Sequence, residues 1–226
     1  AAANALADLL DSLYAEEVGF GALSDAAPAE HAAHWERSRR FLDIIAVEWP
    51  AYLAARGLMD PAERRARLID AQAERLGRLR PQTPVIVAGS TGSAPAVARL
   101  MRAVARLPCG AVVLPGLDRA LDKKAWDAVD DPHPQAGLKA LLAALDVEPA
   151  DVAAWPYGER PSPRSRLLSL ALRPAEATDD WREHIADATA DDPRLARAVA
   201  GLSLVEARDE EAEAAAVSLL LREPLE

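Results

Sequence analysis

The sequence predicts a helix-rich α/β protein in which a helical segment, residues 1–80, precedes an α/β portion, residues 81–226. Three observations predict this class: apolar residues at helical spacing before Pro81, a β-branched run soon after it, and a strand–helix–strand order between residues 84 and 115. Of the 226 residues, 50% are hydrophobic and 27% are charged, which is typical of a folded globular chain.

The first 60 residues carry apolar side chains at intervals of three and four, which indicates amphipathic helices. The pattern predicts one helix over residues 3–17, which Gly19 ends, and a second over residues 31–49. Pro50 can start a short further helix, and Gly57 can close it.

A long helix is expected from Pro61 to about Arg80. Asp60 as N-cap, Pro61 at the first helical position and Glu63 three residues after the cap form an Asp version of the capping box. One face of this helix is apolar and carries Ala62, Ala66, Ile69, Ala73 and Leu76. The opposite face carries four arginines: Arg64, Arg67, Arg75 and Arg78.

Residues 84–115 predict a βαβ unit. Residues 84–88 form a short apolar, β-branched run, residues 95–106 a helix, and residues 110–115 a second strand. Two strands joined by a crossover helix are expected to be parallel.

The later segments give weaker patterns. We expect helices over residues 119–129, 135–145, 165–172, 178–187 and 210–222, a proline-rich loop over 155–163, and a strand over 202–207. The chain does not begin with Met and stops after a helical pattern, so we expect an excised piece whose α/β portion is incomplete at the C-terminus.

Charge is distributed unevenly along the chain. The net charge is −10, made up of −6 over residues 1–30, +6 over residues 31–106 and −10 over residues 107–226. All but three of the 26 basic residues are arginines, whose guanidinium groups bind phosphate or carboxylate with two hydrogen bonds. A codon bias would give the same arginine excess. The acidic total disfavours a nucleic-acid binder with a uniformly basic surface.

Cysteine content and hydropathy limit the other function classes. The single cysteine, Cys109, excludes an internal disulfide and the multi-cysteine sites of zinc ribbons or iron–sulfur clusters. The longest apolar runs are far shorter than the roughly 18 residues that a membrane span needs. We therefore expect a soluble, cytoplasmic protein with no membrane partner, no metal and no cofactor.

The loop formed by Gly89, Ser90, Thr91, Gly92 and Ser93 is the first candidate site. A turn from a strand into a helix directs backbone N–H groups towards an anion. The loop is not a Walker A motif, because two residues rather than four separate its glycines and no lysine follows, and it is not a nucleophile elbow. The alternative is structural: the glycines allow a tight turn and Ser93 caps the next helix.

The second candidate is the face of four arginines at positions 64, 67, 75 and 78. If all four met consecutive phosphates, affinity for nucleic acid would fall with salt at a log–log slope of roughly −3. The alternative is a solvated helix face.

Other polar and aromatic residues have simpler explanations. His31 and His34 could share a ligand but lack a third, and His133 lies in a proline-rich turn. Asp118 follows a strand, where α/β folds place catalytic carboxylates, but Asp118 and Asp122 could equally cap the next helix. The five tryptophans are expected in the core rather than as base-stacking platforms.

Several short segments of the sequence resemble, in the same order, segments of the AddB family of double-strand break repair proteins, alphaproteobacterial type. The longer ones are residues 84–101, 107–118, 133–139, 172–175, 205–211 and 219–223, and the shorter ones are 31–35, 49–50 and 56–65.

The resemblance implies a fragment from the N-terminal half of a longer subunit, a half that is similar to a superfamily 1 helicase without motor activity. Residues 1–80 would be a helicase insert, and residues 81–226 a P-loop or RecA-like portion. Gly89 matches the glycine of helicase motif III, but Ser90 replaces the acid and no glutamine follows. The implied partners are an AddA-type motor and nuclease subunit, and DNA as a single strand or duplex end.

Three functions follow from these observations. The first is a non-catalytic scaffold that binds DNA or the partner subunit, within a parent protein that resembles an ATP-dependent helicase–nuclease. The second is an enzyme for a small phosphate ligand, using residues 89–93 and Asp118. The third is a subunit-interface module that does not touch DNA.

Overall fold

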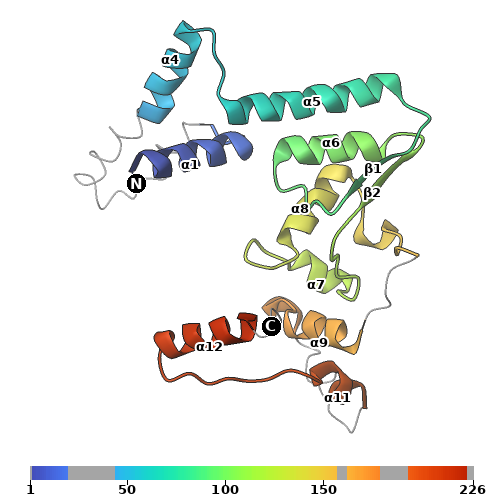
Figure 1. Cartoon of the computed structure of the whole chain (residues 1–226). Helices are drawn as coiled ribbons and strands as arrows, with labels where there is room; N and C mark the ends of the chain where they lie inside the picture. Colours follow the sequence, from blue (N-terminus) through green and yellow to red (C-terminus); the bar gives the residue numbers. More distant parts are fainter. Residues whose placement is uncertain (1, 20–43, 157–161, 179–192, 223–226) are drawn as a thin grey trace. The chain divides into compact units, whose positions relative to one another are not determined.

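The computed structural model describes residues 2–19, 44–156, 162–178 and 193–222 (Figure 1). The chain forms two compact units, Ala1–Gly158 and Glu159–Glu226. This division into compact units differs from the expected boundary between residues 80 and 81. The expected boundary separates a helical segment from a segment that contains strands, and it stays a prediction.

The first unit is helix-rich and contains a two-stranded sheet. Its elements are α1 (Ala2–Ala15), the π-helix η2 (Ile44–Glu48), α4 (Trp49–Ala55), α5 (Pro61–Leu79), β1 (Val85–Ala88), α6 (Pro95–Ala105), β2 (Gly110–Val113), α7 (Lys123–Asp127), α8 (Ala136–Leu145) and the 3-10 turn η3 (Pro149–Asp151). The second unit contains α9 (Pro163–Ala171), the 3-10 turn η4 (Ala175–Ala177), α11 (Pro193–Val199) and α12 (Glu210–Arg222).

The expected βαβ unit is confirmed. β1 and β2 pair in parallel, with Val85 opposite Gly110 and Ala88 opposite Val113, and α6 connects them. Val87 and Val112 pack against a core cluster made of Met101, Leu138, Leu141 and Leu145 from α6 and α8. The other face of the sheet is open, because Ile86 is 62% exposed.

α5 begins as the sequence predicts. Asp60 is its N-cap, and one carboxylate oxygen accepts a hydrogen bond from the backbone N–H of Ala62 at 2.8 Å. The other oxygen accepts one from the indole N–H of Trp49 at 3.0 Å, so this carboxylate, only 4% exposed, is satisfied on both sides. Glu63 does not return to the cap as a full capping box requires; its carboxylate pairs with Arg67.

The apolar face of α5 is confirmed by its packing. Ala62 and Ala73 are buried, and Ala66, Ile69 and Leu76 are half-buried. α5 lies along α6 and also contacts α1 (Figure 1). Small alanine side chains let two helices approach closely, so this stripe fixes which side of α5 faces the protein.

The expected helices over residues 135–145, 165–172 and 210–222 are confirmed as α8, α9 and α12. The helix expected over residues 119–129 is shorter, because Asp122 caps α7 and delays its start. Most of the helices expected over 31–49 and 178–187, and part of the loop over 155–163, lie outside the described residues.

One element was predicted wrongly. Residues 202–207 form no strand. Their β-branched and leucine content favours an extended chain, but a strand needs a hydrogen-bonding neighbour, and Leu204 is 86% exposed. The two strands of the described residues show the α/β class but not a complete RecA-like sheet.

Substitution of Gly92 tests how tightly the βαβ unit is packed. Gly92 has a φ of +62°, and an added Cβ would lie 2.6 Å from Leu141 and 3.2 Å from the sulfur of Met101. We expect Gly92→Ala to lower the free energy of unfolding by about 2–4 kcal/mol, from the left-handed conformation and overpacking together.

Gly89→Ala is the matched control in urea-induced unfolding. Gly89 also has a positive φ, +76°, but nothing lies within 4 Å of an added Cβ. Gly89→Ala should lower the free energy of unfolding by about 1 kcal/mol, from the left-handed backbone conformation alone. Equal losses for the two variants would contradict the close contact of Gly92 with the core.

Candidate functional site

The loop between β1 and α6 is held by one hydrogen bond to β2 and one within the loop. The N–H of Gly89 donates to the carbonyl of Val113 at 3.2 Å, and the N–H of Gly92 donates to the hydroxyl oxygen of Ser90 at 3.1 Å. Both glycines have positive φ, and Gly92 is buried. The structural explanation of the two glycines therefore accounts for their positions.

The N-terminus of α6 differs from its sequence-based expectation. The structural alternative has Ser93 as the N-cap of α6, but the N-cap is Ala94, which makes no side-chain hydrogen bond. Thr91 and Ser93 are exposed, and the loop holds no charged side chain. Any anion at this loop would therefore depend on backbone N–H groups and hydroxyls alone.

The polar residues after β2 form hydrogen bonds that hold turns and cap a helix. The backbone N–H of Asp118 donates to the side-chain oxygen of Gln135 at 3.0 Å, and a carboxylate oxygen of Asp118 accepts from Ala120 N–H at 2.9 Å. Asp122 caps α7. His133 accepts a hydrogen bond through Nδ1 from the backbone of Gln135 at 3.0 Å. These contacts favour the capping and turn interpretations over a catalytic carboxylate.

The aromatic residues have mixed environments. Trp126 is buried in a second core cluster with Val129 and Leu142, as expected, but Trp155 is 59% exposed. Trp35 and Trp181 lie outside the described residues. On α4, Trp49 stacks on Tyr52 with ring centroids 5.7 Å apart and an interplanar angle of 9°.

Arg56 adds to this stack, with its guanidinium carbon 3.7 Å from the centre of the Tyr52 ring. The Tyr52 ring therefore contacts both the Trp49 ring and the Arg56 guanidinium within the protein.

Four of the five arginines of α5, hereafter the arginine ridge (Arg64, Arg67, Arg75 and Arg78), share one face and are all exposed; the fifth, Arg65, is also exposed. This confirms the orientation that the sequence predicts. Within the part of the chain that the structure describes, Arg67 pairs with Glu63 and Arg78 pairs with Glu74 at 3.6 Å, whereas Arg64 and Arg75 have no acidic partner. The spacing of i and i+4 accounts for both pairs and could have predicted them.

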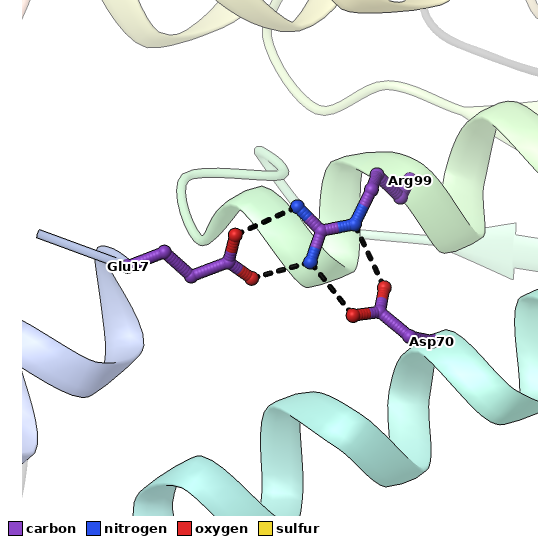
Figure 2. A network of polar contacts seen from close by, with 3 residues as sticks. All are labelled: Glu17, Asp70 and Arg99. Carbon is purple, nitrogen blue, oxygen red and sulfur yellow. Dashed lines mark hydrogen bonds and ion pairs between the residues drawn. The ribbon is translucent and has the colours of Figure 1, made fainter.

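A second arginine cluster was missed by the sequence-based predictions. Arg99 of α6 donates to both carboxylate oxygens of Asp70 on α5, at 2.7 and 2.8 Å. It also donates to both carboxylate oxygens of Glu17, just after α1, one of them at 2.8 Å (Figure 2). We call this three-residue network the Arg99 clamp. It joins α1, α5 and α6 through bidentate, charge-assisted hydrogen bonds.

The clamp also explains the electrostatics of this region. Hydrogen bonds to Glu17 and then to Asp70 raise the pKa of Arg99 above its usual value. A raised folded-state pKa stabilises the fold below the unfolded-state pKa, and this contribution is lost only as the pH rises through the folded value. The guanidinium side of the clamp is therefore constant through the neutral range.

A cavity of about 350 Å³ lies beside the clamp, between α1 and α5. Its acidic lining residues, Glu17, Glu63 and Asp70, are each paired with an arginine. Burial, and then the charges of Asp60 and Glu63, raise the pKa of Tyr14, so its phenol stays neutral. The acidic groups that line the cavity are therefore already held in ion pairs within the protein.

Comparisons with known proteins give no relatives: no family model, curated protein or solved structure matches the chain. Among the described residues, no helix is long and apolar enough to cross a membrane. The same residues contain no cluster of three or more histidine, cysteine, aspartate or glutamate side chains that could hold a metal ion.

The Arg99 clamp is testable by removing its cation. Arg99→Met should lower the free energy of unfolding by about 1–2 kcal/mol, since two partly exposed bidentate pairs are lost. The loss should shrink at high salt, which screens exposed pairs.

Urea-induced unfolding of Arg106→Met gives the control. Arg106 is exposed and has no acidic partner among the described residues. Arg106→Met should therefore lower the free energy of unfolding by less than about 0.5 kcal/mol. If Arg99→Met lowered the free energy of unfolding no more than Arg106→Met does, the clamp would contribute nothing to the stability of the fold.

Proposed function

We propose that this chain is a non-catalytic, helicase-like segment of an AddB-type subunit of a DNA helicase–nuclease that resects double-strand breaks. In this role it is a scaffold that binds DNA and an AddA-type motor subunit. The observation that carries the DNA contact is the exposed arginine ridge, in which Arg64 and Arg75 have no acidic partner among the described residues. The family-like segments of the sequence and the parallel βαβ unit support the helicase-like assignment.

Guanidinium groups on an exposed helix suit a phosphodiester backbone. Each can donate two hydrogen bonds to one phosphate, and each contact releases counterions from the nucleic acid. The net charge of −10 does not oppose a local contact of this kind, because salt screens charges more than about 8–10 Å away. Binding would be weak, independent of base sequence and sensitive to salt.

Three contacts support a non-catalytic role. The N–H groups of Gly89 and Gly92 are used inside the protein, and the loop that holds them has no charged side chain. The carboxylate of Asp118 holds a turn. In a motor, a loop at this place must couple a γ-phosphate to DNA movement through polar side chains. The α/β portion would then be a scaffold, and the small-ligand enzyme gains no support.

A subunit-interface module is the second candidate, and one observation favours it. α12 has no buried residue, and its leucines Leu219, Leu220 and Leu221 are 68%, 57% and 69% exposed. Exposed apolar side chains in a row are typical of protein contacts. An interface module would bind the motor subunit without any dependence on the arginine ridge.

The DNA contact is tested by the double variant Arg64→Gln with Arg75→Gln. Fluorescence anisotropy with a single-stranded oligonucleotide, between about 50 and 200 mM salt, should show weaker binding and a salt slope reduced by about 1.4. The slope changes because two phosphate contacts are lost.

A second double variant, Arg119→Gln with Arg166→Gln, removes the same charge from exposed arginines outside α5. It should bind like the unchanged chain. If both double variants lose the same affinity, the effect is general charge and the ridge is not the contact; if neither changes binding, the interface module is favoured.

A further inference from the structure

α5 contains the same short pattern twice. The sequence Ala-Glu-Arg-x-x-Arg-Leu occupies residues 62–68 and again residues 73–79. The copies are offset by eleven residues, which is close to three helical turns, so corresponding residues lie on one line of the helix. They are separated by about 16 Å along the helix axis.

The two copies also have matching environments. The alanines, Ala62 and Ala73, are buried, and the leucines, Leu68 and Leu79, are 56% and 64% exposed. In each copy the glutamate pairs with the second arginine, and the first arginine is exposed without an acidic partner among the described residues. The ridge therefore repeats one arrangement twice, centred on Arg64 and Arg75. The pair is tighter in the first copy, where Glu63 is 30% exposed, than in the second, where the pair is 3.6 Å long and Glu74 is 72% exposed.

The third acidic residue of α5 does not enter this pattern. Asp70 lies between the two copies, and its carboxylate is held by Arg99 in the clamp, on the side of α5 that packs against α6. Apart from Asp70, the charged groups of α5 are thus the four arginines of the ridge, the glutamates Glu63 and Glu74, and Arg65. Arg65 is exposed at a variable position of the first copy, where the second copy has Leu76.

A repeated cationic unit suits a ligand that repeats its negative charge. A small anion would occupy one unit and gain nothing from the other. A stacked nucleic-acid strand carries a phosphate about every 3.4 Å, so about five nucleotides cover the distance between Arg64 and Arg75. Engagement of both units then makes the second contact intramolecular and raises the affinity.

We infer that α5 carries two similar contact units for a phosphodiester backbone, and that its ligand is a single strand long enough to reach both. This inference rests on the proposed function, because it assumes that the ridge meets nucleic acid. It adds a minimum length of ligand, a similar role for the two unpaired arginines, and a restraining role for the glutamates.

The experiment measures the affinity of the whole chain for oligodeoxyadenylates, whose bases stack, of increasing length. Affinity should rise by about tenfold or more once the strand exceeds about five nucleotides, and then level off. In a chain that also carries Arg65→Gln, so that neither copy has an extra arginine, Arg64→Gln and Arg75→Gln made singly should each remove this step and weaken the long strand to a similar extent. Arg119→Gln should leave the step in place.

The possible outcomes separate this inference from the proposed function. Binding that grows smoothly with length, or single variants of clearly unequal effect, would overturn the two-unit ridge while leaving DNA binding intact. Binding of no oligonucleotide at any length would overturn the proposed function and this inference together.

Glu74→Gln gives an independent test. Glu74 and Arg78 are each 72% exposed, so the substitution frees Arg78 without disturbing a buried contact. The long strand should bind about two- to five-fold more tightly, with a salt slope steeper by about 0.7, because a third arginine becomes available. An unchanged or weaker affinity would show that Glu74 does not restrain the ridge.

Discussion

The orientation of α5 about its own axis is the constraint on which the account depends. Ala62 and Ala73 are buried on the side of α5 that packs against its neighbours, and Asp70 is tied to Arg99 on α6. A shift of one residue would rotate the helix by about 100° and would move arginines towards the buried side, where an unpaired charge is costly. The outward direction of the ridge therefore follows from the same contacts that hold the helix in place.

The start of α5 adds a second restraint. The carboxylate of Asp60 bonds both to the first turn of α5 and to the indole of Trp49 on α4, so the helix begins at a fixed residue. Farther along the chain, the βαβ unit supplies α6 as the surface on which α5 rests, and its loop packs Gly92 against Leu141 and Met101. In this arrangement the loop after β1 packs against the core, and α5 carries the exposed arginine ridge.

Local features were predictable from the sequence, and distant contacts were not. The N-cap at Asp60, the parallel strands and the outward arginines follow from spacing and from residue preferences of neighbouring positions. The Arg99 clamp does not, because its partners lie 29 and 82 residues away and nothing in the local pattern marks Arg99 among the other arginines. Residues 202–207 were misassigned for the converse reason: a strand depends on a partner that propensity cannot supply. The two copies of the pattern in α5 can be seen in the sequence; the structure adds that the glutamate of each copy pairs with an arginine of the ridge.

The most direct test of the account follows the arginine side chains themselves. In NMR spectra of the Nε–Hε groups, titration of the whole chain with an oligodeoxyadenylate should shift the signals of Arg64 and Arg75 together. The signal of Arg99, held by two carboxylates, should stay in place. Shifts confined to other arginines, with those of Arg64 and Arg75 unchanged, would contradict the claim that α5 presents the nucleic-acid contact.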